Sequence, residues 1–129
     1  MATQKLKIMV LDDEPIVCNR LKPALEKLGY EVDTFTQSID AMQKIQGTVY
    51  DIIITDLKMK GIDGMKFLQE AKKRAPETEV IVITGFATLE TAKESFQRGV
   101  FDFIAKPFKL SEIQQVVAKA AAKIQQAGG

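Results

Sequence analysis

Five short apolar segments alternate with five longer amphipathic segments along the 129 residues of the chain. The apolar segments favour β-strands, and we expect strands over Lys5–Leu11, Tyr30–Phe35, Tyr50–Thr55, Glu79–Thr84 and Val100–Ala105. The amphipathic segments predict helices from Pro15 to Leu28, from Ser38 or Asp40 to Gly47, from Met65 to just before Pro76, over Thr88–Gln97 and over Leu110–Gln125. Strict alternation of strands and helices indicates a parallel sheet with helices on both faces. The pattern therefore predicts one doubly wound α/β domain over residues 1–129, with a core of about residues 5–123 and a short flexible C-terminal tail.

Pro23 lies within the first predicted helix. A proline inside a helix removes one backbone hydrogen bond, at a typical cost of about 3 kcal/mol. We therefore expect this helix to be kinked at Pro23 or divided into two segments.

Polar residues of particular kinds stand at the ends of four predicted strands. Asp12 and Asp13 follow the first strand, Asp56 follows the third, Thr84 ends the fourth, and Lys106 follows the fifth. In an open parallel sheet the carboxyl ends of the strands lie side by side at one edge, where ligands bind. Three carboxylates, a hydroxyl and an ammonium should therefore converge there, which is typical of a metal-and-phosphate site.

These side chains suggest magnesium and phosphoryl chemistry. Three carboxylates that lie close together repel one another, and a hard divalent cation relieves the repulsion. Magnesium prefers one or two carboxylates together with waters and phosphate oxygens. A carboxylate can also attack a phosphoryl group and form an acyl phosphate. Mg²⁺, Lys106 and Thr84 would then position the group and neutralise its charge.

The composition argues against several other kinds of chemistry. The chain has no histidine, which removes Ser-His-Asp and Cys-His catalysis, the common zinc sites and a phosphohistidine carrier. Neither a G-x-G-x-x-G nor a Walker sequence is present. The net charge of +1 argues against nucleic acid or a membrane surface as the main partner.

Three features lead us to expect a cytoplasmic protein. No apolar stretch approaches the roughly 18 residues of a membrane span. The polar segment Met1–Lys7 does not have the character of a secretory signal. Cys18 is the one cysteine, so that no internal disulfide can form.

The polar residues at the strand ends belong to four short sequences, LDD, ITD, ITG and AKP, which follow one another in this order. Each is weak evidence alone, but together they resemble the receiver (CheY-like) domain of two-component response regulators. The resemblance covers about residues 5–123. It implies a flavodoxin-like (βα)5 three-layer sandwich, whose five-stranded parallel sheet has the order 2-1-3-4-5.

The resemblance also assigns roles to residues at this edge. Asp56 would accept the phosphoryl group. Asp12, Asp13 and Asp56 would hold Mg²⁺, with the backbone carbonyl of Lys58 as a further ligand. Lys106 would pair with the phosphoryl oxygens.

The resemblance also implies that two further residues of this chain form a conformational switch. Thr84 would move toward the phosphoryl group, and Phe103 would turn inward behind it. Family members have a cis peptide bond at the position of Lys106–Pro107, which is tolerable because the second residue is proline.

The resemblance implies a signalling switch rather than an enzyme. A sensor histidine kinase or a phosphotransfer protein would phosphorylate Asp56, and phosphorylation would shift the conformation of a surface that contacts an output protein. The chain's own chemistry would be limited to phosphorylation from small donors and loss of the phosphoryl group. We expect a monomer or a phosphorylation-dependent dimer, with no direct contact to nucleic acid or membrane.

Several alternatives stay open at this point. A Mg²⁺-dependent phosphohydrolase usually has its nucleophile on the first strand and a second Asp two residues later, whereas Asp12 and Asp13 are adjacent. The acidic pocket disfavours a flavin- or nucleotide-binding module, and the presence of both acceptor and lysine disfavours a pseudo-receiver. The segment Ile83–Phe108 resembles the receivers of NtrC-like transcription regulators. The chain is therefore either a stand-alone regulator or a receiver from such a regulator or from a hybrid kinase.

Overall fold

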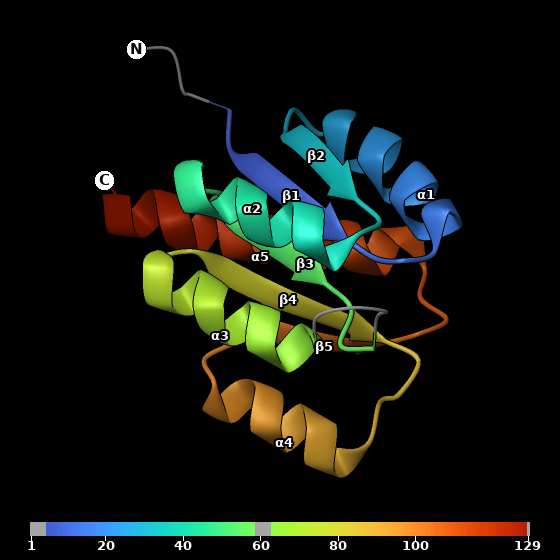
Figure 1. Ribbon diagram of the computed structural model, residues 1–129. Coiled ribbons are helices and arrows are strands. Elements are labelled where there is room, and N and C mark those ends of the chain that lie inside the picture. Colours follow the sequence, from blue (N-terminus) through green and yellow to red (C-terminus); the bar gives the residue numbers. More distant parts are fainter. Residues whose placement is uncertain (1–4, 59–62, 129) are drawn as a thin grey trace.

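The computed structural model describes residues 5–58 and 63–128, and within them strands and helices alternate (Figure 1). The strands are β1 (Lys7–Leu11), β2 (Glu31–Phe35), β3 (Ile52–Thr55), β4 (Glu79–Thr84) and β5 (Asp102–Ala105). The helices are α1 (Pro15–Glu26), α2 (Ser38–Gly47), α3 (Gly64–Arg74), α4 (Leu89–Gln97) and α5 (Leu110–Gly128). Each predicted element is therefore present, with ends that differ by a few residues.

The strands form one parallel sheet in the order β2-β1-β3-β4-β5. The side chains of β3 and β4 are buried along their whole length, and those of β1 are buried after Lys7. Strands covered on both faces need apolar residues on both sides, which explains why these segments are continuous apolar runs. The predicted fold class and strand order are confirmed.

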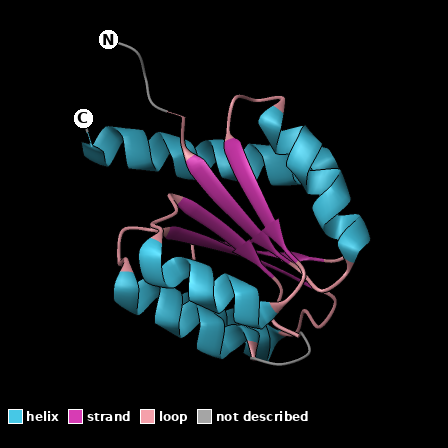
Figure 2. Ribbon diagram, turned by 45° about the horizontal axis from the view of Figure 1, so that its top comes forward, coloured by secondary structure: helices cyan, strands magenta, loops and turns pink. Residues whose placement is uncertain are grey.

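The sheet separates two hydrophobic cores (Figure 2). Helices α1 and α5 cover one face, where Leu21 and Val117 pack against the sheet. Helices α2 and α3 cover the other face, where Ala41 and Phe67 pack. Among the helices of the described residues, none has the length and apolar character needed to cross a membrane.

Helix α4 is held less firmly than the other helices. Ser95 is the one buried residue among its nine, whereas Leu89 is 86% and Phe96 51% exposed. The first turn is fixed by a capping box, in which the Thr88 and Thr91 hydroxyls each accept a backbone amide of the other residue at 3.0 Å. The apolar side chains of α4 thus point largely away from the core.

Two helices differ from the sequence prediction. Helix α1 continues through Pro23 to Glu26 as one helix, so the expected division into two segments is wrong. Pro23 has no amide to donate, so one bond of the ladder is missing, but the residues on both sides of it stay helical. Helix α5 extends to Gly128, beyond the predicted end at Gln125.

Leu21→Ala should lower the free energy of unfolding by about 2–5 kcal/mol, because the fully buried side chain would leave a cavity between α1 and the sheet. Urea unfolding followed by circular dichroism measures the change. Leu28→Ala is the matched control, because Leu28 is 48% exposed, and its effect should be about 0.5 kcal/mol or less. Equal losses in the two variants would contradict the packing described here.

Candidate functional site

The register of the sheet places Asp12 beside Asp56. Leu11 of β1 pairs with Thr55 of β3, and the Asp56 amide donates a hydrogen bond to the Leu11 carbonyl at 3.1 Å. The next residue of each strand is therefore an aspartate at the same level of the sheet edge. Both are buried, with Asp12 0% and Asp56 4% exposed.

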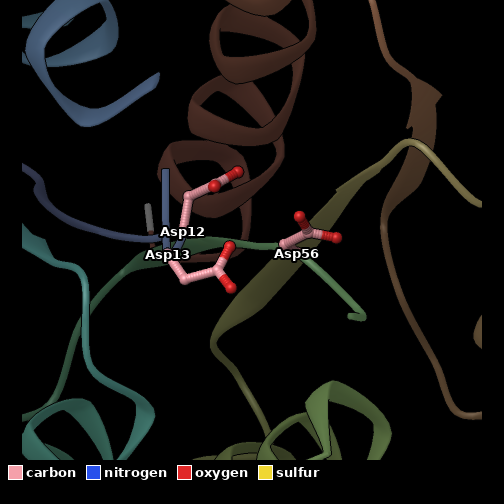
Figure 3. Close-up of side chains that lie close together, drawn as sticks. All are labelled: Asp12, Asp13 and Asp56. Carbon is pink, nitrogen blue, oxygen red and sulfur yellow. The ribbon is translucent and has the colours of Figure 1, made fainter. Parts of the chain in front are cut away.

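Asp13 completes an acidic cluster with these two residues (Figure 3). One carboxylate oxygen of each aspartate lies within 4.8 Å of the others. Consecutive residues of an extended strand point to opposite sides, so a turn is needed to bring Asp12 and Asp13 to one space. Asp12 provides one, because its Oδ1 accepts a hydrogen bond from the Glu14 amide at 2.9 Å.

Hydrogen bonds hold both carboxylate oxygens of Asp56. Oδ1 accepts the backbone amides of Leu57 at 2.6 Å and Lys58 at 3.2 Å, and Oδ2 accepts Lys106 Nζ at 2.9 Å. The side chain of Lys58 turns elsewhere, with its ammonium 5.0 Å from the centre of the Phe86 ring. The Asp56 carboxylate is therefore oriented by the main chain on one side and by a cation on the other.

Lys106 reaches back from the end of β5 to three carboxylates. Its Nζ lies 2.7 Å from Glu14 Oε1, 2.9 Å from Asp56 Oδ2 and 2.8 Å from Asp12 Oδ2. The backbone amide of Lys106 donates to the Thr84 carbonyl at 2.8 Å, which fixes the start of the turn after β5. A single ammonium therefore serves acidic side chains from both β1 and β3.

The positive charge of Lys106 does not fully balance the buried acid groups. Asp12 Oδ2 lies 2.8 Å from Lys106 Nζ, in an ion pair outside good hydrogen-bond geometry, and it has no other polar partner among the described residues. Burial raises the pKa of Asp12 above its ordinary 3.8, and Lys106 and the Glu14 amide offset only part of this. Burial would lower the pKa of Lys106, but the attraction of its three carboxylate partners outweighs burial and raises the pKa above the ordinary 10.5.

This donor set suits a hard divalent cation. Magnesium takes oxygen ligands and is usually bound by one or two carboxylates, with waters in the remaining positions. The cluster offers three carboxylates, one of which has a buried oxygen whose one partner among the described residues is the Lys106 ammonium. The residues present therefore fit Mg²⁺, whereas a ligand role for the Lys58 carbonyl stays a prediction.

Thr84 and Phe103 lie on the neighbouring strands β4 and β5. Thr84 is fully buried, and its hydroxyl accepts the Phe86 amide at 3.0 Å. Phe103 is half-buried, pairs with Val82 across the sheet and packs against the core beneath α2 and α3. The Lys106–Pro107 peptide bond is cis. A switch role for Thr84 and Phe103 needs a second arrangement of both side chains and stays a prediction.

Two residues at the site were not singled out by the sequence interpretation. Glu14 contacts Lys106 over a separation of 92 residues, and no local pattern signals this pairing. Gly64 begins α3 so close to Asp56 that an added Cβ would lie 2.5 Å from both the Asp56 carbonyl oxygen and the Leu57 Cα. Glycine is a poor helix former, so its presence at the first position of a helix needs another reason. The sequence could therefore have indicated that the backbone passes close by at Gly64.

The five-stranded parallel sheet and the acidic cluster at its carboxyl edge agree with a comparison with known families. The sequence model of one family, the response regulator receiver domain, matches residues 8–118 of the chain. The chain therefore belongs to the family of response regulator receiver domains.

Individual relatives support the same family. The chain is 30% identical over 128 residues to the transcriptional regulatory protein ZraR of Salmonella typhimurium, and the match covers 99% of this chain but 29% of that protein. Among solved structures, a receiver domain from Clostridium thermocellum is 31% identical with a TM-score of 0.87, over 95% of this chain and 98% of that chain. A CheY-like receiver domain from Methanospirillum hungatei shares the fold, with a TM-score of 0.92 at 24% identity, over 96% and 99% of the two chains.

Gly64→Ala should lower the free energy of unfolding by about 1–3 kcal/mol, because the new Cβ collides with the backbone of Asp56 and Leu57. Urea unfolding measures this loss. Gly47→Ala is the matched control: its Cβ would meet nothing within 4 Å, and it should leave stability unchanged or raise it by up to about 1 kcal/mol. A Gly64→Ala variant as stable as Gly47→Ala would count against the close approach.

Asp12→Asn should stabilise the fold at pH 7 in buffer without divalent cations. The folded-state pKa of Asp12 lies above 3.8, so the folded chain binds this proton more tightly than the unfolded chain does. The cost of the buried charge is full above the folded-state pKa, declines as the pH falls through it, and is absent well below 3.8. The stabilisation should therefore shrink as urea unfolding is repeated from pH 7 down to pH 4.

The exposed Asp40 provides the control for this titration. Asp40→Asn should change stability by about 0.5 kcal/mol or less at any of these pH values. A stabilisation by Asp12→Asn that is the same at every pH would show that the charge of Asp12 is not its cause.

Proposed function

We propose that this receiver domain is a phosphoacceptor switch of a two-component signalling system, with Asp56 as the acceptor. One observation carries the proposal: Asp12, Asp13, Asp56 and Lys106 converge at the carboxyl edge of the sheet. The adjacent Asp12 and Asp13, and membership of the receiver family, favour this function over a phosphohydrolase.

The proposed reaction moves a phosphoryl group to a carboxylate oxygen of Asp56. A P–O bond to Asp56 forms while the bond from phosphorus to the donor breaks, and the leaving group departs with the electron pair, so that nothing is oxidised or reduced. Negative charge is spread over the phosphoryl oxygens during transfer, and Lys106 lies where it can pair with them. The amides of Leu57 and Lys58 keep the carboxylate in place.

A metal ion belongs to this proposal as well. Mg²⁺ held by Asp12, Asp13 and Asp56, with the Lys58 carbonyl as a further ligand, would supply positive charge to the phosphoryl oxygens. The unmet negative charge around Asp12 supports this assignment.

The proposed output is a shift between two conformations that both exist before phosphorylation. Thr84 would turn toward the phosphoryl group, and Phe103 would turn inward behind it. Thr84 is linked to α4 through one residue: its hydroxyl accepts the Phe86 amide, and the Thr91 hydroxyl donates to the Phe86 carbonyl at 3.0 Å. A movement of Thr84 would therefore reach α4 directly.

The proposed phosphoryl donor is a sensor histidine kinase or a phosphotransfer protein. The proposed receiver of the signal is an output protein. ZraR and NtrC are named as transcriptional regulators, and the chain matches 29% and 25% of their lengths. We propose that this chain corresponds to their receiver portion and that it makes no direct contact with DNA. A cytoplasmic location, a monomer or phosphorylation-dependent dimer, and the absence of a turnover reaction are further parts of the proposal.

Incubation with acetyl phosphate and Mg²⁺ should add the mass of one phosphoryl group to the intact protein, and Asp56→Asn should abolish the gain because the nucleophilic oxygen is lost. Intact-protein mass spectrometry measures it. Asp40→Asn, which changes an exposed carboxylate on α2, should be phosphorylated like the unaltered protein.

A chelator should also prevent the gain in the unaltered protein. Phosphorylation of Asp56→Asn would place the acceptor on another residue. A folded, unaltered protein that gains no phosphoryl group would point to a pseudo-receiver that acts through constant protein contacts.

A further inference from the structure

Glu14 stands at the N-cap position of α1, but its carboxylate does not cap the helix. It makes no side-chain hydrogen bond to the amides of the first turn. Its Oε1 instead accepts Lys106 Nζ at 2.7 Å, across the sheet edge from the end of β1 to the end of β5. The side chain is 57% exposed, so packing does not force this contact.

The ammonium of Lys106 has three N–H donors, and the surrounding carboxylates leave little of this capacity free. Glu14 and Asp56 take directed hydrogen bonds of 2.7 and 2.9 Å, and Asp12 Oδ2 lies 2.8 Å away. A phosphoryl group brings a charge of about −1.5 to −2 and three further acceptor oxygens. It can gain the ammonium only by displacing one of the present partners.

Glu14 is the partner that is displaced most easily. The side chains of Asp12 and Asp56 are 0% and 6% exposed, and a buried carboxylate that loses its cation has no water to replace it. Glu14 returns to solvent when it releases Lys106, and exposed ion pairs of this kind are weak. The three contacts are therefore similar in length but unequal in strength.

We infer that Glu14 is a positioning residue for the phosphorylation of Asp56: it shares Lys106 in the unphosphorylated protein and competes with the phosphoryl group for the same ammonium. The inference rests on the proposed function. Transfer from acetyl phosphate breaks its bridging P–O bond, releases acetate and forms the bond to Asp56, and Glu14 takes part in neither bond. Without this competitor, Lys106 is free for the group in transfer, and phosphorylation is faster.

The test compares four versions of this chain: the unaltered sequence, Glu14→Gln, Glu14→Asp and Glu90→Gln. Glu14→Asp keeps the charge but withdraws the carboxylate by one C–C bond, about 1.5 Å. Glu14→Gln keeps the length but leaves a neutral amide oxygen, which is a weaker acceptor for Lys106. Glu90 lies exposed in the first turn of α4, is not among the carboxylates paired with Lys106, and is the matched control.

Initial rates of phosphorylation are measured by intact mass over a range of acetyl phosphate concentrations at fixed Mg²⁺. We expect both Glu14 variants to react about two- to fivefold faster than the unaltered chain at saturating donor, as the loss of a weak competing ion pair allows. Glu90→Gln should match the unaltered chain.

Nuclear magnetic resonance of the Lys106 ammonium provides a second readout. The signal should shift in both Glu14 variants and stay in place in Glu90→Gln. A purely structural role of Glu14 at the start of α1 would change the melting temperature and leave the ammonium signal where it is.

Unchanged rates in both Glu14 variants would overturn the inference. A faster rate in Glu14→Gln but not in Glu14→Asp would overturn it too, because the cause would be net charge rather than the contact. An unaltered chain that gains no phosphoryl group would contradict the proposed function itself, and the inference with it.

Discussion

One ammonium among buried carboxylates governs the energetics of the functional edge. Charges as deeply buried as those of Asp12 and Asp56 cost several kcal/mol each unless they are paired. Lys106 pairs with both, yet burial still raises the pKa of Asp12 above its ordinary value. The fold therefore keeps an excess of negative charge at this edge of the sheet, and such a site favours the binding of a cation. A fully neutralised cluster would bind a divalent cation far less readily.

The rest of the structure explains why this excess of negative charge arises where it does. The pairing of Leu11 with Thr55 brings Asp12 and Asp56 to the same level, and the burial of the sheet on both faces removes water from around them. The contact of Gly64 with the Asp56 carbonyl then leaves no room for a side chain at the start of α3. The apolar strands that stabilise the domain thus also bring the carboxylates together, away from water, at the edge of the sheet.

Sequence reasoning could reach the fold and the acidic cluster because both follow from order along the chain. Apolar runs fix the strands, parallel pairing brings their carboxyl ends together, and the aspartates stand directly after those ends. It could not reach the contact of Glu14 with Lys106, because that pairing depends on the exact path of two loops far apart in sequence. The expected division of α1 at Pro23 was wrong, because one missing hydrogen bond does not end a helix whose apolar face packs against the sheet.

The loose packing of α4 has a consequence for the ensemble of the molecule. A helix with Ser95 as its one buried side chain opens locally at a small fraction of the free energy that unfolds the central strands. Few buried contacts therefore oppose a shift of α4 against the sheet, so that the ratio of two α4 positions would depend on small energies. A single hydrogen bond contributes about 0.5–1.5 kcal/mol, a several-fold change in such a ratio. The bond from Thr91 to the Phe86 carbonyl is one that can set this ratio.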